Sequence, residues 1–296
     1  MENEDIDIKQ ITLGRLIQLL DNTSSIFANE PNYKTLGEDK PIVFIGDTHG
    51  DFETTKKIVK KFGETHLLVF LGDYVDRAPE GQCSLNNICY LLELKEKNHA
   101  NIEMLRGNHE FPEIFYYYGF GNEIYEIYEN EDLLNNFIEL FSQMPYVVTT
   151  KNGLIGLHGG LPNISSIDEL RNIPKGIKHY SHHKIVSQIV WNDNLKDGAS
   201  QKDGIFFSER DFKLDEAFLY GEPYFSKQME ILGKNVLVRG HDYQAKGFNL
   251  NNKVLTIFTS RLYADYGSLK GVYVAVMDDP KKEIKTAKDL RIEQID

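Results

Sequence analysis

The sequence predicts an α/β fold built on a mixed β-sheet, and two observations lead to this class. Short continuous apolar runs, such as PIVFIG and HLLVFLG, are typical of strands that are buried on both faces. Stretches with helical spacing of apolar residues, such as FETTKKIVKKFG, lie between them. The order strand, helix, strand indicates βαβ units with parallel strands. Periodicity alone predicts this class and does not define the number or arrangement of the layers.

The first half of the chain continues this order. Residues 8–20 have apolar positions at helical spacing and predict a helical N-terminal segment. The βαβ pattern begins at Pro41, and a helix over 84–97 and a strand over 101–107 extend it. Residues 113–144 predict helices with a break near two glycines, and we expect the tyrosines of this stretch to pack between helices.

The second half is richer in strands. Apolar runs predict strands over 145–150, 153–160, 235–242, 254–260 and 271–279. Among them, residues 193–216 are polar, contain glycine and show little periodicity. A long irregular segment inside a compact domain is often functional, so we expect this segment to contribute to a site.

Composition narrows the function. The 296 residues carry a formal net charge of −12, which argues against general binding of nucleic acid or acidic membranes. No apolar run approaches the roughly 18 residues that a membrane span requires, and the acidic first residues lack the pattern of a signal peptide. Cys83 and Cys89 lack metal-site spacing and are expected to be small buried groups. We therefore expect a cytoplasmic protein.

Five of the apolar runs stop at a glycine that lies next to Asp, Asn or His. The side chains at these endings are Asp47, His49, Asp73, Asn108, His158 and His241. Oxygen and nitrogen ligands without thiolates suit hard or borderline metal ions. Residues so far apart in sequence share a site only within one folded unit, so we expect one large domain. Two metals held this way activate water and bind an anionic substrate.

The endings and their neighbours closely resemble the phosphoprotein phosphatases, which are metallophosphatases that act on phosphoserine and phosphothreonine. The shared motifs, in order, are residues 46–50 (GDTHG), 72–77 (GDYVDR), 106–110 (RGNHE), 158–160 (HGG) and 239–241 (RGH). The resemblance covers nearly the whole chain and implies a four-layer α/β-β/α sandwich with two central mixed sheets. Residues 260–263 read SRLY, which is similar to the prokaryotic, especially archaeal, branch.

The resemblance also assigns the metal ligands. It places Asp47, His49 and Asp73 on a first ion, with Asp73 bridging to a second ion that Asn108, His158 and His241 complete. Mn²⁺ is the expected metal, although oxygen and nitrogen ligands also accept Fe or Zn.

The remaining roles follow from the same motifs. His109 resembles the general acid that protonates the leaving oxygen when a metal-held hydroxide attacks phosphorus in line, and Asp76 resembles its orienting partner. Arg77 matches the arginine that binds phosphate. Arg210 is the candidate for a second such arginine, but an aspartate follows it where the family often has glycine. Tyr263 is expected to place a hydroxyl near the phosphate.

We expect three parts: a helical N-terminal segment packed on the main domain (1–38), a metallophosphatase catalytic domain (39–280) and a C-terminal tail (281–296). The expected partners are phosphorylated proteins as substrates and inorganic phosphate as product. Two alternatives stay open. One is a dinucleoside polyphosphate hydrolase that shares the metal motifs, and the other is a catalytically silent protein that only binds phosphoproteins.

Overall fold

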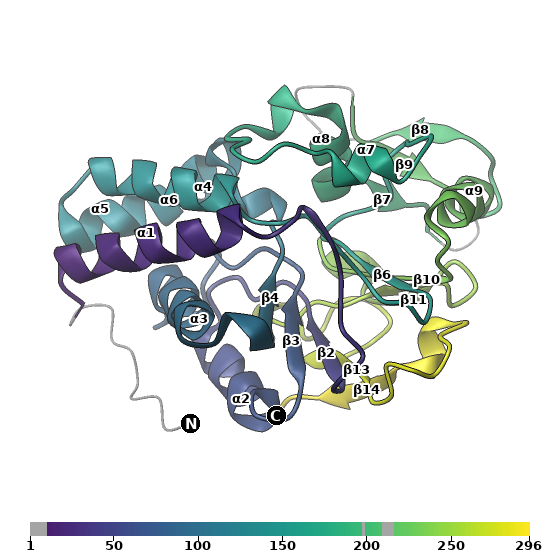
Figure 1. Ribbon diagram of the computed structural model, residues 1–296, viewed down its shortest axis with the longest axis horizontal. Coiled ribbons are helices and arrows are strands. Elements are labelled where there is room, and N and C mark those ends of the chain that lie inside the picture. The colour runs from purple at the N-terminus through teal and green to yellow at the C-terminus, as the bar shows by residue number, and fades with distance from the viewer. Residues whose placement is uncertain (1–10, 197–198, 209–215) are drawn as a thin grey trace.

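The computed structural model describes residues 11–196, 199–208 and 216–296. Over these residues two mixed sheets lie at the centre, with helices on both sides (Figure 1). Alternation along strand β2 (Ile42–Ile45) shows the layering: Ile42 and Phe44 join the core between the sheets, whereas Val43 and Ile45 face a helical layer. A third core lies between the other sheet and the remaining helices. The predicted four-layer α/β sandwich is confirmed.

The first sheet has five strands in the order β14-β13-β2-β3-β4. Strands β2, β3 and β4 are parallel, as the βαβ pattern predicts, with Ile42 opposite Leu67. β13 runs antiparallel to β2, and β14 runs antiparallel to β13. The strands beyond β2 are β3 (Leu67–Phe70), β4 (Ile102–Met104), β13 (Tyr273–Met277) and β14 (Arg291–Gln294).

The second sheet has six strands in the order β1-β5-β6-β10-β12-β11. Its central strand β10 is parallel to both neighbours, β6 and β12. Its strands are β1 (Tyr33–Thr35), β5 (Val147–Thr149), β6 (Leu154–Gly156), β10 (Val236–Arg239), β11 (Gly247–Asn249) and β12 (Val254–Thr256).

The helices flank these sheets. They are α1 (Leu13–Ala28), α2 (Phe52–Phe62), α3 (Ser84–Asn98), α4 (Pro112–Tyr118), α5 (Phe120–Tyr128), α6 (Asp132–Ser142), α7 (Asp168–Arg171), α8 (Lys184–Trp191) and α9 (Glu222–Leu232). Gly119 lies in the left-handed region at φ 108° and separates α4 from α5, which confirms the predicted break. In the described part of the chain, no helix combines the length and the apolar character that crossing a membrane requires.

The terminal segments take part in the sheets. α1 packs on α3 and α6, and β1 then pairs with β5. Residues 291–294, assigned by sequence to a tail, form β14 and extend the five-stranded sheet. Both termini thus supply edge strands, although the predicted boundaries at 38 and 280 remain predictions.

A third, small sheet lies in the segment expected to be irregular. Its order is β7 (Asp193–Asn194), β9 (Phe218–Tyr220), β8 (Ile205–Phe207). The expectation of an irregular stretch over 193–216 was therefore wrong for the residues of β7 and β8. Arg210 lies outside the described residues.

Candidate active site

The six predicted metal ligands gather at one rim of the two sheets. Asp47 and His49 follow β2, Asp73 follows β3, and Asn108 follows β4. His158 follows β6 and His241 follows β10, both from the second sheet. All six side chains are buried. Parallel strands end at the same edge of a sheet, so residues that lie far apart in sequence meet there.

The backbone at this rim is strained. His49, Asp73 and His241 have φ values of 43°, 57° and 70°, although none is glycine. Asp76 and Arg77 lie in the same left-handed region, at 64° and 55°. Each such residue costs about 1–3 kcal/mol and persists where function or packing requires the conformation. The strain falls on residues that carry the predicted chemistry.

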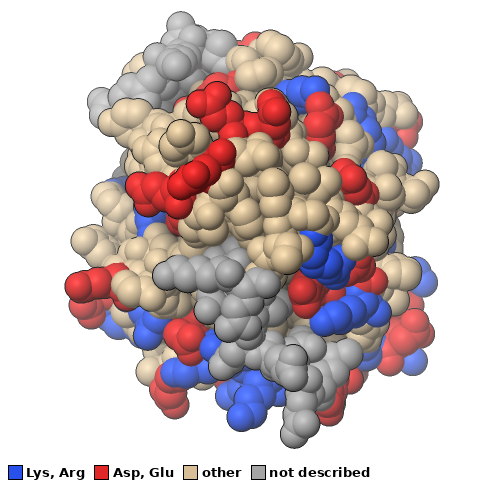
Figure 2. All heavy atoms as spheres, turned by 90° about the vertical axis from the view of Figure 1, so that its left-hand side faces the viewer, with Lys and Arg blue, Asp and Glu red and all other residues tan. Residues whose placement is uncertain are grey.

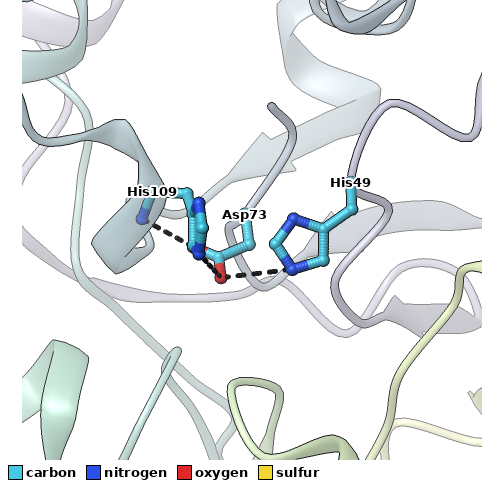
Figure 3. Close-up of side chains that lie close together, drawn as sticks. All are labelled: His49, Asp73 and His109. Atoms are coloured by element: carbon cyan, nitrogen blue, oxygen red, sulfur yellow. Dashed lines mark hydrogen bonds and ion pairs between the residues drawn. The ribbon is translucent and has the colours of Figure 1, made fainter. Parts of the chain in front are cut away.

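Asp73 lies at the centre of the site, between the imidazoles of His49 and His109 (Figure 3). His49 Nε2 is 3.7 Å from Asp73 Oδ2 and 3.9 Å from Asp47 Oδ2. His49 Nδ1 is 3.0 Å from the Val75 carbonyl oxygen, so Nε2 is the nitrogen directed at the carboxylates. Nε2 is buried and has no hydrogen-bond partner among the described residues. A buried ring nitrogen that faces two carboxylates fits a cation between them.

Asn108 is the centre of the second half of the site. His158 Nε2 is 2.8 Å and His241 Nδ1 is 3.0 Å from Asn108 Oδ1. His158 Nε2 also lies 3.4 Å from Asp73 Oδ1, which places Asp73 in both halves. His158 Nδ1 is 2.9 Å from the Leu71 carbonyl oxygen, the arrangement that commonly orients a ligating imidazole.

Charge at the site favours a cation. Burial raises the pKa of Asp47 to about 8, and the nearby Asp73 carboxylate also raises it. Burial lowers the pKa of His158, but the carboxylates of Asp73 and Asp47 outweigh this effect and raise it to about 9. Carboxylates and imidazoles are thus buried close together, and a divalent ion between them would stabilise the ionised carboxylates.

Two groups of metal-type side chains meet here: His49, Asp73 and His109, and Asp47, Asp73 and His158. Within each group the ligand atoms lie within 4.8 Å of one another. Asp73 belongs to both groups. The groups differ from the predicted ligand sets, because Asp47 falls with His158 and His49 falls with His109. The donor set of carboxylates and imidazoles fits two hard or borderline ions.

His109 also pairs with Asp76. Asp76 Oδ2 is 2.7 Å from His109 Nδ1, and Asp76 Oδ1 accepts a hydrogen bond from the Phe120 N–H at 3.0 Å. Burial raises the pKa of Asp76 to about 8 and lowers the pKa of His109 well below its usual value. Because Asp76 occupies Nδ1, the ring directs Nε2 at the cluster, 4.0 Å from Asp73 Oδ2.

Comparison with known proteins agrees with this geometry. Residues 40–245 match the family described as calcineurin-like phosphoesterase, which is more than two thirds of the chain. The chain belongs to this family. It is therefore a metallophosphatase, a class that acts on phosphorylated substrates.

Solved structures of similar fold include a protein serine/threonine phosphatase from Saccharomyces cerevisiae with similarity to human phosphatase PP5. The TM-score is 0.81 at 22% identity, covering 96% of this chain and 89% of that chain. A cold-active protein tyrosine phosphatase gives a TM-score of 0.55 at 14% identity, covering 86% and 78%. The cold-active protein-tyrosine phosphatase of a psychrophilic Shewanella species gives 0.53 at 14% identity, covering 92% and 84%.

Arg77 is held at the edge of the metallophosphatase site by aromatic residues. Its guanidinium carbon lies 4.3 Å from the centre of the Tyr118 ring, and the hydroxyl groups of Tyr118 and Tyr263 lie close to its side chain. The centre of the Tyr263 ring lies 5.9 Å from that of His49. Tyr118 lies 4.9 Å from His109. Sequence reasoning assigned Tyr118 to packing between helices, and that expectation was wrong.

Two further residues that support the site were not singled out from the sequence. Glu110 accepts hydrogen bonds from the backbone N–H groups of Gly107, Asp73 and Tyr74, at 2.8 to 2.9 Å. It thereby ties the loop after β3 to the loop after β4. Asp193 lies 2.5 Å from Arg239 and 3.7 Å from His241 Nε2. The position of Glu110 next to His109 in RGNHE was the available signal, whereas Asp193 had none.

Asp51 links three segments of the chain. Its buried carboxylate caps α2 by accepting from Thr54 N–H, and it also accepts from the Arg261 backbone N–H at 2.8 Å and from Arg261 Nε at 3.1 Å. Gln82 Nε2 donates to the same carboxylate at 3.3 Å. Asp51 therefore anchors the loop that carries Tyr263 to the start of α2.

We expect Asp51→Ala to lower the free energy of unfolding by about 2 kcal/mol, because it removes a helix cap and leaves buried donors unpaired. Urea unfolding measures this loss. Asp51→Asn is the matched control, since its amide oxygen can still accept from Thr54, and it should cost less. Equal midpoints for the wild type and Asp51→Ala would show that the carboxylate does not hold these segments.

Proposed function

We propose that this metallophosphatase removes phosphate from phosphoserine and phosphothreonine on proteins. One observation carries the proposal: the His109–Asp76 pair borders the Asp73 cluster, with Arg77 and Tyr263 on the same rim. This arrangement suits a small dianion bound between a metal cluster and an arginine, next to a proton donor. The likeness in fold to a serine/threonine phosphatase, over 96% of this chain, supports the choice of substrate class.

For the metal ligands, we propose the two sets that the sequence predicts. Asp47, His49 and Asp73 would hold one ion, and Asp73, Asn108, His158 and His241 would hold the other. When bound, two such ions make a water molecule nucleophilic at neutral pH and stabilise the charge on the phosphoryl oxygens. We propose Mn²⁺ as the resident metal and the cytoplasm as the location.

The chain's own residues supply binding and proton transfer. Arg77 binds phosphate oxygens through its planar guanidinium, which Tyr118 and Tyr263 hold in place. His109 donates a proton from Nε2 to the leaving serine or threonine oxygen. Asp76 orients the imidazole by its hydrogen bond to Nδ1. Protonation matters because an alkoxide is a poor leaving group.

One assay tests the substrate class. Protein loaded with Mn²⁺ is given a phosphothreonine peptide, a phosphotyrosine peptide of the same sequence, and diadenosine tetraphosphate. We expect the phosphothreonine peptide to have the highest kcat/KM. Faster cleavage of diadenosine tetraphosphate would favour the nucleotide hydrolase, and faster cleavage of phosphotyrosine would reassign the substrate. No hydrolysis of these three substrates or of p-nitrophenyl phosphate would favour the silent binding protein.

A separate prediction concerns the second arginine. Arg210→Ala is expected to weaken inhibition by free phosphate about tenfold or more, because a charge-assisted pair contributes on the order of 1.5–3 kcal/mol. The inhibition constant for phosphate in p-nitrophenyl phosphate hydrolysis measures the effect. Arg171→Ala, on exposed helix α7, is the matched control and should leave the constant unchanged. An unaltered constant in Arg210→Ala would remove Arg210 from the site.

A further inference from the structure

The segment between Arg106 and Lys151 contains no lysine or arginine, yet it contains eight acidic residues. The chain as a whole has 33 basic residues in 296, a frequency that would place about five in a segment of this length. The segment forms helices α4, α5 and α6. The segment is therefore more acidic than the average composition of the chain predicts.

The same helices expose aromatic surface. Tyr117 is 82% exposed, Tyr116 58% and Tyr125 52%. A hollow of about 440 Å³ is lined in part by Tyr116, Tyr125, Glu131 and Asp132. Exposed rings beside hollows are typical of interaction sites, since large aromatic residues are usually covered in a folded protein.

A second hollow, of about 450 Å³, continues this surface. It is lined by Pro112, Glu113, Tyr116, Tyr117 and His179. Tyr116 lines both hollows, so they adjoin at this ring. We call this surface the α4–α6 face and define it by Glu113, Tyr116, Tyr117, Tyr125, Glu126, Glu131 and Asp132.

The α4–α6 face is connected to the proposed proton donor through Tyr118, whose ring lies 5.1 Å from that of Tyr117. Helix α4 starts three residues after His109, and Tyr118, at its end, packs 4.9 Å from the His109 ring. The leaving oxygen belongs to the substrate's own serine or threonine, so the substrate chain must extend from the side of the site where His109 lies. The α4–α6 face is the surface next to it on that side.

The charges on this face are available to a partner. Glu126, Glu131 and Asp132 are exposed and form no ion pair within the described part of the chain. Figure 2 shows the side of the molecule that carries α1 and α5, where acidic side chains gather in the upper part beside a broad uncharged area. Carboxylates within about 8–10 Å of a bound chain still attract it at physiological salt.

We propose that the α4–α6 face binds a lysine- or arginine-rich segment that flanks the phosphorylated residue. This inference rests on the proposed function, and it names the substrate class more closely. A lysine or arginine finds both partners there: tyrosine rings for a cation–π contact, and carboxylates for its charge. Its stem also covers apolar ring surface. An acidic flank would meet only like charge.

The experiment compares three phosphothreonine peptides that differ only in their flanks, which are arginine-rich, glutamine-rich or glutamate-rich. We expect kcat/KM to be about tenfold higher for the arginine-rich peptide than for the glutamine-rich one, and lowest for the glutamate-rich one. Raising the salt concentration to 0.5 M should remove most of the difference, because it screens exposed charges.

The triple variant Glu126→Gln, Glu131→Gln, Asp132→Asn should lose most of the preference and hydrolyse p-nitrophenyl phosphate at the wild-type rate. Tyr117→Ala, at a largely exposed position, should reduce the preference two- to fivefold. The matched control is Asp168→Asn, Asp279→Asn, Glu283→Gln, which changes charge equally on α7 and after β13. It should keep the full preference.

Fluorescence anisotropy of the unphosphorylated arginine-rich peptide separates this inference from the proposed function. Binding to the wild type but not to the triple variant would support the α4–α6 face as the binding site for a basic segment, even if no phosphopeptide is hydrolysed. Equal kcat/KM for the three peptides, together with equal binding by wild type and triple variant, would overturn it. So would a homodimer in sedimentation that the triple variant abolishes and the peptide does not disrupt, because the face would then bind a second copy.

Discussion

Replacing His109 with asparagine is expected to lower kcat for a phosphothreonine peptide by a factor on the order of 10²–10⁴. The reason is the loss of the proton that the leaving oxygen needs. Hydrolysis of p-nitrophenyl phosphate should fall much less, since p-nitrophenolate leaves without protonation. Steady-state kinetics on both substrates measures the difference.

Metal content distinguishes this role from a second one that the geometry allows. His109 Nε2 is 4.0 Å from Asp73 Oδ2, close enough that His109 also joins His49 and Asp73 in a group of metal-type side chains. If His109 is the acid, His109→Asn retains two metal ions per chain by elemental analysis. Loss of an ion, with equal losses on both substrates, would instead identify His109 as a ligand. Asp76→Asn should give the same pattern as His109→Asn to a smaller extent.

Replacing Asp73 with asparagine is expected to weaken both metal ions together and to abolish most activity. Asp73 Oδ2 faces His49, and Asp73 Oδ1 lies 3.4 Å from His158 Nε2, so one carboxylate serves both halves of the site. The amide removes the negative charge while keeping nearly the same shape. Metal titration followed by calorimetry, with elemental analysis of dialysed protein, measures the two affinities.

Asp193→Asn is the matched control for Asp73→Asn. Asp193 lies 3.7 Å from His241 Nε2, which belongs to one half of the site, so this change should weaken one ion by about 10–100-fold. The comparison tests the bridging role directly. Selective loss of one ion from Asp73→Asn, with the other unaffected, would contradict it.

Much of the site could be predicted because its parts are local. Strands β2 and β3 are continuous apolar runs, and each ends at a glycine followed by a ligand-type residue. A buried strand and its termination depend on residues within a few positions. The requirement for glycine at position 46 is not local, because a Cβ there would lie 2.0 Å from the carbonyl oxygen of Ile257.

Other parts depend on partners far away in the sequence. β8 has two exposed residues among its three, Ile205 and Phe207, and lacks the apolar pattern of a buried strand. β14 reads RIEQ and forms a strand because its backbone pairs with β13. Asp51 and Arg261 meet across 210 positions. No local pattern identifies such residues, because their structure depends on the strands and side chains that pack against them in the folded protein.

The sequence by itself determined the ligand chemistry, because the identity of each side chain at a strand end sets whether it offers an oxygen or a nitrogen donor. Tertiary structure alone decided that Asp193 lies beside His241, that Asp51 meets Arg261, and that Tyr116, Tyr117, Tyr118 and Tyr125 lie on the surface. When apolar and aromatic residues occur all round a helix, its sequence does not show which face is buried. Here the packing of α5 and α6 against the core determines the buried face and leaves the tyrosines outside.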